Sequence, residues 1–424
     1  MAILAVNAGS SSLKFSLHPL QDGQVQPHVL SGCVQGLEPG GSPVMDWKYQ
    51  GQKQQEALRV PAEAASSFAV ALERLRVLVQ SLQGADIQAV AHRVVHGGGV
   101  FTESVYVTDA VLEQLARFNS LAPLHQPHNL AGIRQFRAAF PELPQVACFD
   151  TAFHANMPEV DYAFALPRAL REQGVRRYGF HGLSYQYVMS VLHAQTLRGR
   201  GRVVMAHLGN GASLCACKDG VSVATTMGFS ALDGLMMGTR SGSLDAGVLL
   251  YLLEQGWDHG RIEKLLYKQS GLLGVSGISA DMRALRADGS ADAQRAIAQF
   301  THRVVRETGA LIACLTAWTC WPSAAASART TPCCASRRAT AWHGRACAST
   351  RSATARPTAT RPGPSTRLTA GWKSGSCPPT KAAWPRARRR RCWSRARRWT
   401  ALQRSDLRAG GARLLRAFAL FLIA

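Results

Sequence analysis

The feature that most constrains this 424-residue chain is a change of composition after Leu315. Residues 1–315 hold 27 Lys and Arg against 25 Asp and Glu, whereas residues 316–424 hold 22 basic residues and one acid, Asp406. The formal net charge of +23 therefore comes almost entirely from the second segment. A near-neutral balance is typical of an ordinary globular enzyme, so the two segments have to be interpreted separately.

The composition of residues 1–315 argues against several classes of protein. No basic stretch precedes Ile3–Val6, so no secretory signal peptide is expected. No apolar run reaches the roughly 18–20 residues that a membrane span needs. Cys215 and Cys217 are compatible with half of a metal site, but two thiols alternating along a strand pattern are more often ordinary strand residues. We expect a cytoplasmic protein with reduced thiols and no membrane partner.

Residues 1–315 alternate between strand and helix patterns. Strands are expected where short apolar runs end in a polar or glycine-rich turn or at an acid, as at residues 3–6, 90–95, 145–149 and 203–208. Helices are expected where apolar residues recur every three or four positions, as at residues 62–82, 109–118, 248–254 and 291–315. This alternation predicts an α/β fold, and the similar turns after Val6 and Leu208 predict two related domains that face one cleft.

Two of these turns have the composition of phosphate-binding loops. The first runs from Asn7 to Lys14 through Ala-Gly-Ser-Ser-Ser-Leu, in which small residues allow backbone N–H groups to approach a phosphate. Lys14 supplies a point charge, and the Asn7 side chain is an oxygen ligand suited to Mg²⁺ or its water shell. The second turn consists of His207, Leu208, Gly209, Asn210 and Gly211. Each turn alone is also compatible with a surface hairpin, but two at strand ends favour a phosphate site.

Charged and imidazole side chains occur beside further glycine-rich segments. Arg93 ends a strand pattern before Gly97–Gly99, and Arg240 lies between Gly238 and Gly242; a guanidinium binds a carboxylate or phosphate through two parallel hydrogen bonds. Asp150 ends another strand pattern, and His125 and His181 lie in predicted loops. Taken singly such residues are usually structural, but their clustering at strand ends favours an active site.

These motifs resemble the acetate kinases, a family of the actin-like and sugar-kinase ATPase superfamily. The matching stretches follow the family order over most of residues 1–315: Asn7–Leu17, His92–Phe101, Leu121–Ile133, Phe149–Pro158, Arg176–Gly182, His207–Ser213, Met227–Gly242 and Ser270–Arg283. The resemblance implies two ribonuclease-H-like domains around a cleft. The first is an N-terminal domain at residues 1–150, and the second is a nucleotide-binding domain at residues 151–315 that is incomplete.

The resemblance also implies a reaction, in which ATP reversibly phosphorylates acetate to acetyl phosphate, with Mg²⁺ or alternatively Mn²⁺ as the metal. By position, Arg93 and His125 would bind acetate, and Asp150, His181 and Arg240 would be catalytic. Asn7 would hold the metal. The nucleotide would contact Lys14, the turn from His207 to Gly211, and the segment of Asp281, Met282 and Arg283. The substrate partners would be acetate and ATP, with no nucleic acid, and the family implies a homodimer.

Several positions depart from the family pattern. Leu183 and Tyr185 stand where Thr and His are usual, and Gln126, Ala224, Ser243 and Ala246 also differ. None of these changes removes a catalytic group named above. They leave the acyl-chain preference open, so a propionate or other short-chain acyl kinase is the alternative within the family.

The family's next landmarks, a Gly-Ile-Gly-Glu-Asn adenosine loop and a late Pro-Thr-Asn-Glu, do not occur in residues 316–424. The segment lacks Val, Glu, Asn and Tyr but holds seven Trp and six Cys, which is unusual for a disordered tail. Reading codons from the third base of one residue and the first two of the next makes Thr316–Thr330 compatible with the adenosine loop. The same frame makes Cys377–Lys381 compatible with Pro-Thr-Asn-Glu. We therefore interpret the tail as a shift of reading frame.

Two consequences follow for residues 316–424. They are expected to be aberrant and disordered, so that the chain as written has little or no activity and poor solubility. The rival interpretation is a nucleic-acid-binding tail, because Arg386–Arg398 is interleaved with Trp side chains. A steeply salt-dependent affinity for DNA would distinguish it.

Overall fold

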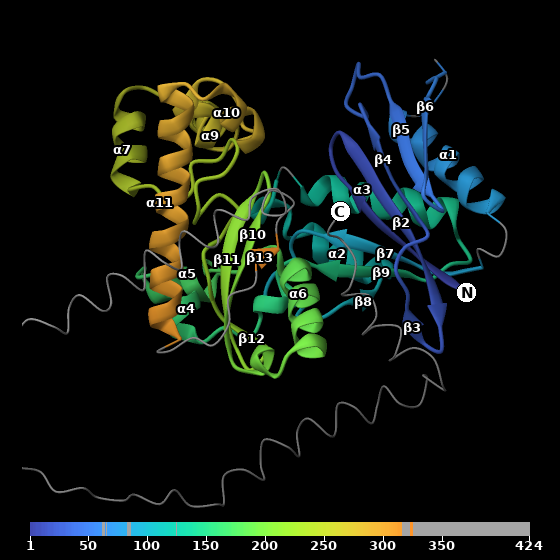
Figure 1. Cartoon of the computed structure of the whole chain (residues 1–424), viewed down its shortest axis with the longest axis horizontal. Helices are drawn as coiled ribbons and strands as arrows, with labels where there is room; N and C mark the ends of the chain where they lie inside the picture. Colours follow the sequence, from blue (N-terminus) through green and yellow to red (C-terminus); the bar gives the residue numbers. More distant parts are fainter. Residues whose placement is uncertain (62–63, 65, 83–85, 124, 316–322, 325–424) are drawn as a thin grey trace, which may run out of the picture. The chain divides into compact units, whose positions relative to one another are not determined.

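The computed structural model describes residues 1–61, 64, 66–82, 86–123, 125–315 and 323–324, all of which belong to one compact unit (Figure 1). The predictions for residues 316–424 therefore lie outside the described residues, apart from Ser323 and Ala324. The described part confirms the α/β class, because it contains two sheets with α-helices packed on them.

The first sheet is built around the strand that precedes the Asn7 turn. Its strands run in the order β6-β5-β4-β2-β1-β7-β9-β8, with β3 paired to β2. Strands β1, β2 and β4 are antiparallel neighbours, whereas β7 and β9 continue the sheet in parallel to β1. The bounds are β1 Ala2–Ala8, β2 Ser12–Gln21, β3 Gln24–Val25, β4 Leu30–Gln35, β5 Val44–Tyr49, β6 Gln52–Ala57, β7 Ile87–Val94, β8 Val105–Tyr106 and β9 Gln145–Phe149.

The second sheet repeats this plan on a smaller scale. Its order is β12-β11-β10-β13, with bounds β10 Arg202–Leu208, β11 Ala212–Lys218, β12 Val221–Thr225 and β13 Ser323–Ala324. As in the first sheet, a leading strand forms a hairpin with the next one and pairs in parallel with a later strand on its other edge. The equivalence of β1 and β10 agrees with the prediction, made from their turns, that the two halves are related.

Helices cover both faces of these sheets. Their bounds are α1 Ser67–Ser81, α2 Asp109–Ala116, α3 Gln126–Ala139, α4 Glu159–Tyr162, α5 Arg168–Glu172, α6 Gly182–Gln195, α7 Ala246–Glu254, α8 His259–Lys268, α9 Gly271–Ser276, α10 Met282–Asp288 and α11 Ala291–Cys314. None of the helices in the described ranges is both long and apolar enough to cross a membrane.

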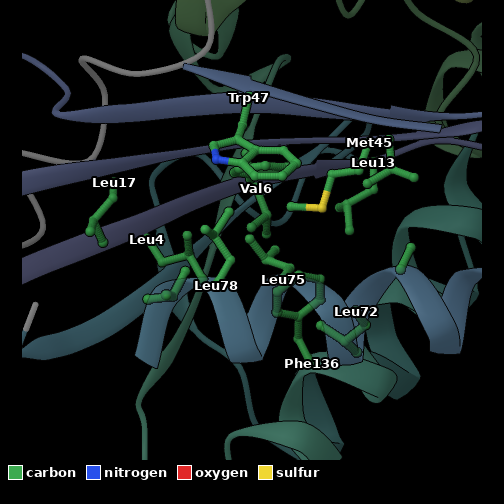
Figure 2. Packing of buried hydrophobic residues seen from close by; sticks show 14 of the residues in the cluster. Leu4, Val6, Leu13, Leu17, Met45, Trp47, Leu72, Leu75, Leu78 and Phe136 are labelled. Carbon is green, nitrogen blue, oxygen red and sulfur yellow. The ribbon is translucent and has the colours of Figure 1, made fainter. Parts of the chain in front are cut away.

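The alternation of side chains along β1 assigns its two faces to different cores. Leu4 and Val6 pack with Leu72 and Leu75 of α1 and with Phe136 of α3 (Figure 2). The residues between them, Ile3 and Ala5, point to the opposite face and join a cluster that includes Leu183 of α6. The face of the first sheet that carries Ile3 and Ala5 is therefore the one that meets the start of α6.

The second sheet is likewise packed on both faces. Val204 and Ala206 of β10 pack with Val304 and Leu311 of α11, whereas Val203 and Met205 pack with Tyr185 and Met189 of α6. Helix α6 thus contributes to the cores on one face of each sheet. Its first turn is held at the junction of residues that come from both sheets.

The helix ends agree closely with the sequence patterns. Thr108 caps α2, because its hydroxyl accepts a hydrogen bond from the Val111 N–H at 3.2 Å. Ser66 caps α1 in the same way, so that helix begins later than residue 62, where the apolar pattern started. Helix α11 runs from Ala291 to Cys314, and its C-cap is Leu315, the last residue before the composition changes.

Candidate active site

The first predicted phosphate turn joins β1 to β2 as a tight hairpin. The Gly9 N–H donates to the Ser12 carbonyl at 2.8 Å, which closes the turn. Asn7 and Lys14 are directly opposite in the β1–β2 register, so their side chains lie on one face. That face also carries Ile3 and Ala5, and it is therefore the one that meets α6.

The second predicted turn joins β10 to β11 and packs against the Arg240 segment. The Gly209 N–H donates to the Gly211 carbonyl at 3.1 Å, and the Gly238 N–H donates to the Asn210 carbonyl at 2.9 Å. A Cβ at Gly238 would stand 1.9 Å from Asn210 Oδ1. A side chain at position 238 would therefore displace the Asn210 side chain, and the backbone carbonyl of Ala280 would lie 3.2 Å from its Cβ.

Two of the predicted groups, Arg93 and Asp150, form an ion pair. Arg93 donates to Asp150 Oδ2 from Nη2 at 2.6 Å and from Nε at 3.1 Å. These residues end the parallel strands β7 and β9, which brings their side chains to the same sheet edge. Burial lowers the pKa of Arg93 but the charge and hydrogen bonds of Asp150 raise it, and the net shift is upward.

The imidazoles of His181 and His207 stack on each other. Their ring centroids are 4.0 Å apart, with 25° between the ring planes. His181 Nδ1 lies 2.8 Å from Ser213 Oγ, and His207 Nδ1 lies 2.9 Å from Ser184 Oγ. The pKa of His181 falls well below its ordinary value because of burial first, and then because of the neighbouring charges. Burial also lowers the pKa of His207, so both rings are neutral at pH 7.

His181 also has an unusual backbone. Its φ is 60°, in the left-handed region, where it serves as the N-cap of α6. The next residue, Gly182, donates its N–H to the Asp150 carbonyl at 2.8 Å, and a Cβ at Gly182 would stand 2.2 Å from that oxygen. Strain of this kind is retained where the surroundings enforce it, as is common at functional sites.

Arg240 completes the charged cluster. Its Nη1 donates to the Ala231 carbonyl at 3.0 Å. A Cβ at Gly211 would stand 3.3 Å from His181 Nε2 and 3.7 Å from Arg240 Nη1, so both groups face the turn after β10. Burial lowers the pKa of Arg240, and repulsion from Arg93 adds to the same effect.

A small apolar pocket contains the predicted substrate residue His125. Its volume is about 20 Å³, and its walls come from Val95, Leu121, Ala122, Pro123, His125, Phe180, Ser230, Ala231 and Tyr267. Three wall residues lie next to the charged cluster. Val95 is two residues after Arg93, and Phe180 directly precedes His181. The carbonyl of Ala231 accepts the hydrogen bond from Arg240. The pocket therefore adjoins the charged cluster.

The predicted nucleotide segment Asp281–Arg283 lies at the start of α10. Asp281 caps this helix by accepting from the Arg283 N–H at 2.8 Å, and it also pairs with the Arg283 guanidinium at 2.7 Å. The preceding carbonyl, of Ala280, would be 3.2 Å from a Cβ at Gly238. The structure thus brings this segment close to the turn after β10, while the Asp281 carboxylate itself pairs with Arg283.

The model of the acetokinase family matches residues 2–318 of the chain. The chain belongs to the acetokinase family. The match ends three residues after the change of composition, so the membership rests on the near-neutral segment and not on the basic tail.

The similarity to individual proteins agrees with this family assignment. It is 49% identical over 317 residues to an acetate kinase of Rhodopseudomonas palustris, an alignment that covers 74% of this chain and 79% of the relative. Among solved structures it is similar to a propionate kinase from Francisella tularensis, with 38% identity and a TM-score of 0.68 over 73% and 80% of the two chains. The acetate kinase of Porphyromonas gingivalis gives 35% identity and a TM-score of 0.66 over 74% and 80%.

These comparisons confirm the predicted family and its actin-like fold. The roles of the individual site residues remain predictions. The fold does, however, bring most of them together: an ion pair, a ring stack and mutual electrostatic effects connect Arg93, Asp150, His181, His207 and Arg240.

Sequence reasoning missed the residues that hold this cluster. Ser213 and Tyr185 were visible only as part of a turn and as a departure from the family. Their side chains form a hydrogen-bond chain to His181. Asn129 accepts from the Val95 N–H at 3.1 Å and donates to the Ala8 carbonyl at 2.7 Å. No local pattern distinguishes such an asparagine from a surface residue, because its partners are distant in sequence.

The cysteines of the predicted strand lie in the core. Cys215 and Cys217 are buried on β11, with their sulfur atoms 3.6 Å apart. Within the described ranges, no three His, Cys, Asp or Glu side chains are grouped so as to hold a metal ion.

Proposed function

We propose that residues 1–315 carry the substrate site of an acetate kinase, which transfers the γ-phosphoryl group of ATP to the carboxylate of acetate. The observation that carries this proposal is the convergence of two arginines, one carboxylate and two neutral imidazoles beside a small apolar pocket. Phosphoryl transfer requires alignment and charge stabilisation more than covalent participation by the protein, and this cluster supplies both.

The pocket supports acetate as the acceptor. Arg93 uses Nε and Nη2 for Asp150, which leaves Nη1 to bind a substrate carboxylate. The methyl group would then enter the pocket beside Val95, with His125 on its wall. Acetate is already ionised at pH 7, so no strong general base is needed, and Asp150 serves to position Arg93.

The turns support ATP as the donor. Gly209, Gly211 and Gly238 have no side chain, so phosphate oxygens can approach the backbone of the turn after β10. His181 would donate a hydrogen bond to the transferring group, and Arg240 would neutralise its negative charge. Lys14 would contact phosphate, and Asp281–Arg283 would contact the nucleoside.

The donor set also fits a divalent cation of the Mg²⁺ type. Asn7 and Asp150 offer oxygen atoms, and Mg²⁺ is commonly held by one or two protein oxygens together with waters and substrate phosphates. When bound, such an ion would neutralise charge on the phosphates. Mn²⁺ is the alternative metal.

Propionate is the alternative acceptor. The pocket is partly open, so its small volume does not by itself exclude an ethyl group. One methylene is worth about 1–3 kcal/mol in a hydrophobic pocket, or about 10–200-fold in kcat/KM. The ratio of kcat/KM for acetate and propionate distinguishes the two acceptors.

For the chain as written we propose little or no activity, because the adenosine loop and the late acid are missing. β13 pairs in parallel with β10 at Ala206 and His207, and the restored frame would place the adenosine loop directly after this strand. We propose domains at residues 1–150 and 151–315, followed by an aberrant tail.

The test is to express two chains, one as given and one with the frame restored after codon 315. Acetyl phosphate should form at a high rate only with the restored chain. Normal activity of the chain as given would refute the frame interpretation, and an inactive but folded restored chain would refute the proposed function. Sequencing the DNA upstream of codon 316 decides the origin of the shift.

A homodimer is also proposed, as the family implies. Helix α7 supports it, because Leu250, Tyr251 and Leu253 are between 52% and 63% exposed. Such a cluster of large apolar side chains is typical of an interface. A monomeric mass in sedimentation equilibrium of the restored chain would contradict the dimer.

A further inference from the structure

A chain of hydrogen bonds runs from the core to His181 and is not needed by the mechanism above. The Tyr185 hydroxyl lies 2.5 Å from Ser213 Oγ, which lies 2.8 Å from His181 Nδ1. His181 and Tyr185 are four residues apart at the start of α6, so they share one face of the helix. Ser213 faces them from β11, opposite His207 in the register of the second sheet.

The environment of Tyr185 determines which way the hydrogen bonds run. Tyr185 is 1% exposed, and it packs among Met189, Val203, Met205 and the two buried cysteines, which offer at most weak sulfur acceptors. A buried hydroxyl that fails to donate is destabilising by about 1–3 kcal/mol, so the phenol donates to Ser213. The single hydrogen of the Ser213 hydroxyl is then directed at His181.

This direction fixes the tautomer of His181. A neutral imidazole that accepts at Nδ1 carries its hydrogen on Nε2. Nε2 is the atom that faces the turn after β10, at 3.3 Å from the position of a Cβ on Gly211. The left-handed backbone of His181, at the N-cap of α6, also restricts where the ring can lie.

We propose that Tyr185 is a positioning residue, which acts through Ser213 to keep the Nε2 hydrogen of His181 directed at the site of the transferring phosphoryl group. The purpose of this arrangement rests on the proposed kinase function, but the hydrogen-bond chain itself does not. The family pattern has His at position 185, so this protein makes the hydrogen bond to Ser213 with a residue that departs from that pattern.

The decisive measurement is the tautomer of His181, which is independent of activity. The full-length chain and the frame-restored chain would be labelled with ¹⁵N-histidine, and the ring nitrogens observed by NMR, with His181→Asn identifying the signal. In the unmodified chains Nε2 should be protonated and Nδ1 should not. In Tyr185→Phe the serine hydroxyl can turn, so the signal should move toward a mixture of both tautomers, and Ser213→Ala should do the same.

Tyr178→Phe is the matched control. Tyr178 is also buried, and its hydroxyl also donates one hydrogen bond, to the Gly174 carbonyl at 2.8 Å, but it does not reach His181. It should leave the tautomer unchanged. A protonated Nδ1 in the unmodified chain would overturn the proposal, as would a Tyr185→Phe signal that stays in place while Ser213→Ala moves it.

Kinetics of the restored chain supply a second readout. Loss of a fixed tautomer should lower kcat of Tyr185→Phe by about tenfold or more with KM changed less than about twofold, because the interaction is with the transition state. The double variant with Ser213→Ala should be no worse than either single variant, since both break one chain. If the restored chain is inactive, the proposed function fails, and the tautomer still tests the role of Tyr185.

Discussion

Replacement of Asp150 by Asn tests how strongly the site depends on the Arg93–Asp150 pair. The carboxylate is 3% exposed, and two donors of one guanidinium converge on a single oxygen. Asp150→Asn keeps the shape of the side chain and removes its charge, so it leaves Arg93 without its counter-ion. Removing one partner of a buried pair is more destabilising than removing the pair, because the other charge stays desolvated.

The geometry of the pair gives the expected loss of unfolding free energy. Two unit charges about 4 Å apart interact by about 4 kcal/mol at an effective dielectric constant of about 20. The Arg93 side chain is 27% exposed, so solvent screens part of this interaction energy. We expect Asp150→Asn to lower the free energy of unfolding by about 2–3 kcal/mol. With a urea dependence of about 2–3 kcal/mol per molar, the midpoint should fall by about 1 M.

The assay is urea unfolding followed by far-ultraviolet circular dichroism, which does not depend on activity. Asp109→Asn is the matched control, because the Asp109–Arg137 pair has the same 2.6 Å separation but an acid that is 85% exposed. A surface pair contributes about 0–1 kcal/mol, so its midpoint should barely move. Equal shifts for the two variants would show that burial does not strengthen the Arg93–Asp150 pair.

Further predictions concern the buried histidines and the packed glycine. Burial lowers the pKa of His92 and of His96 to about 4 from 6.5. Below pH 6.5 the unfolded chain therefore binds more protons at these two rings than the folded chain does. Stability present above pH 6.5 should therefore fall by about 2 kcal/mol per histidine between pH 6.5 and 5, and urea midpoints that do not change over this range would contradict the burial of neutral rings. Gly238→Ala should destabilise the fold by about 1–3 kcal/mol and raise KM for ATP in the restored chain, since the methyl overlaps Asn210; Gly99→Ala, with open space around it, should do neither.

The fold and the site were predictable from the sequence to different degrees. The strand at the start of the chain and the helix that ends before residue 315 were both evident, because periodicity and capping are local signals. Helix α3 was not predicted. Its buried face includes Gln126 and Asn129, polar residues that interrupt the apolar pattern because they bond to backbone groups of other loops.

For the site, residue types were predictable and pairings were not. Arg93 and Asp150 could each be identified at the end of a strand, but their ion pair depends on β7 and β9 being parallel neighbours. Tyr185 and Ser213 likewise meet only because α6 packs on β11. Long-range topology decides such contacts, and no spacing in the chain encodes them.

The left-handed backbone of His181 has a consequence for mutational tolerance. Among side chains, Asn and Asp adopt this conformation most readily, and Gly adopts it without strain. A saturation library at position 181 should therefore divide in an unusual way, with Gly and Asn folding best while lacking an imidazole, and with β-branched residues folding worst. Selection for folding and selection for catalysis would thus favour different residues at position 181. Measuring the amount of folded protein separately from the catalytic rate of each variant would distinguish the two effects.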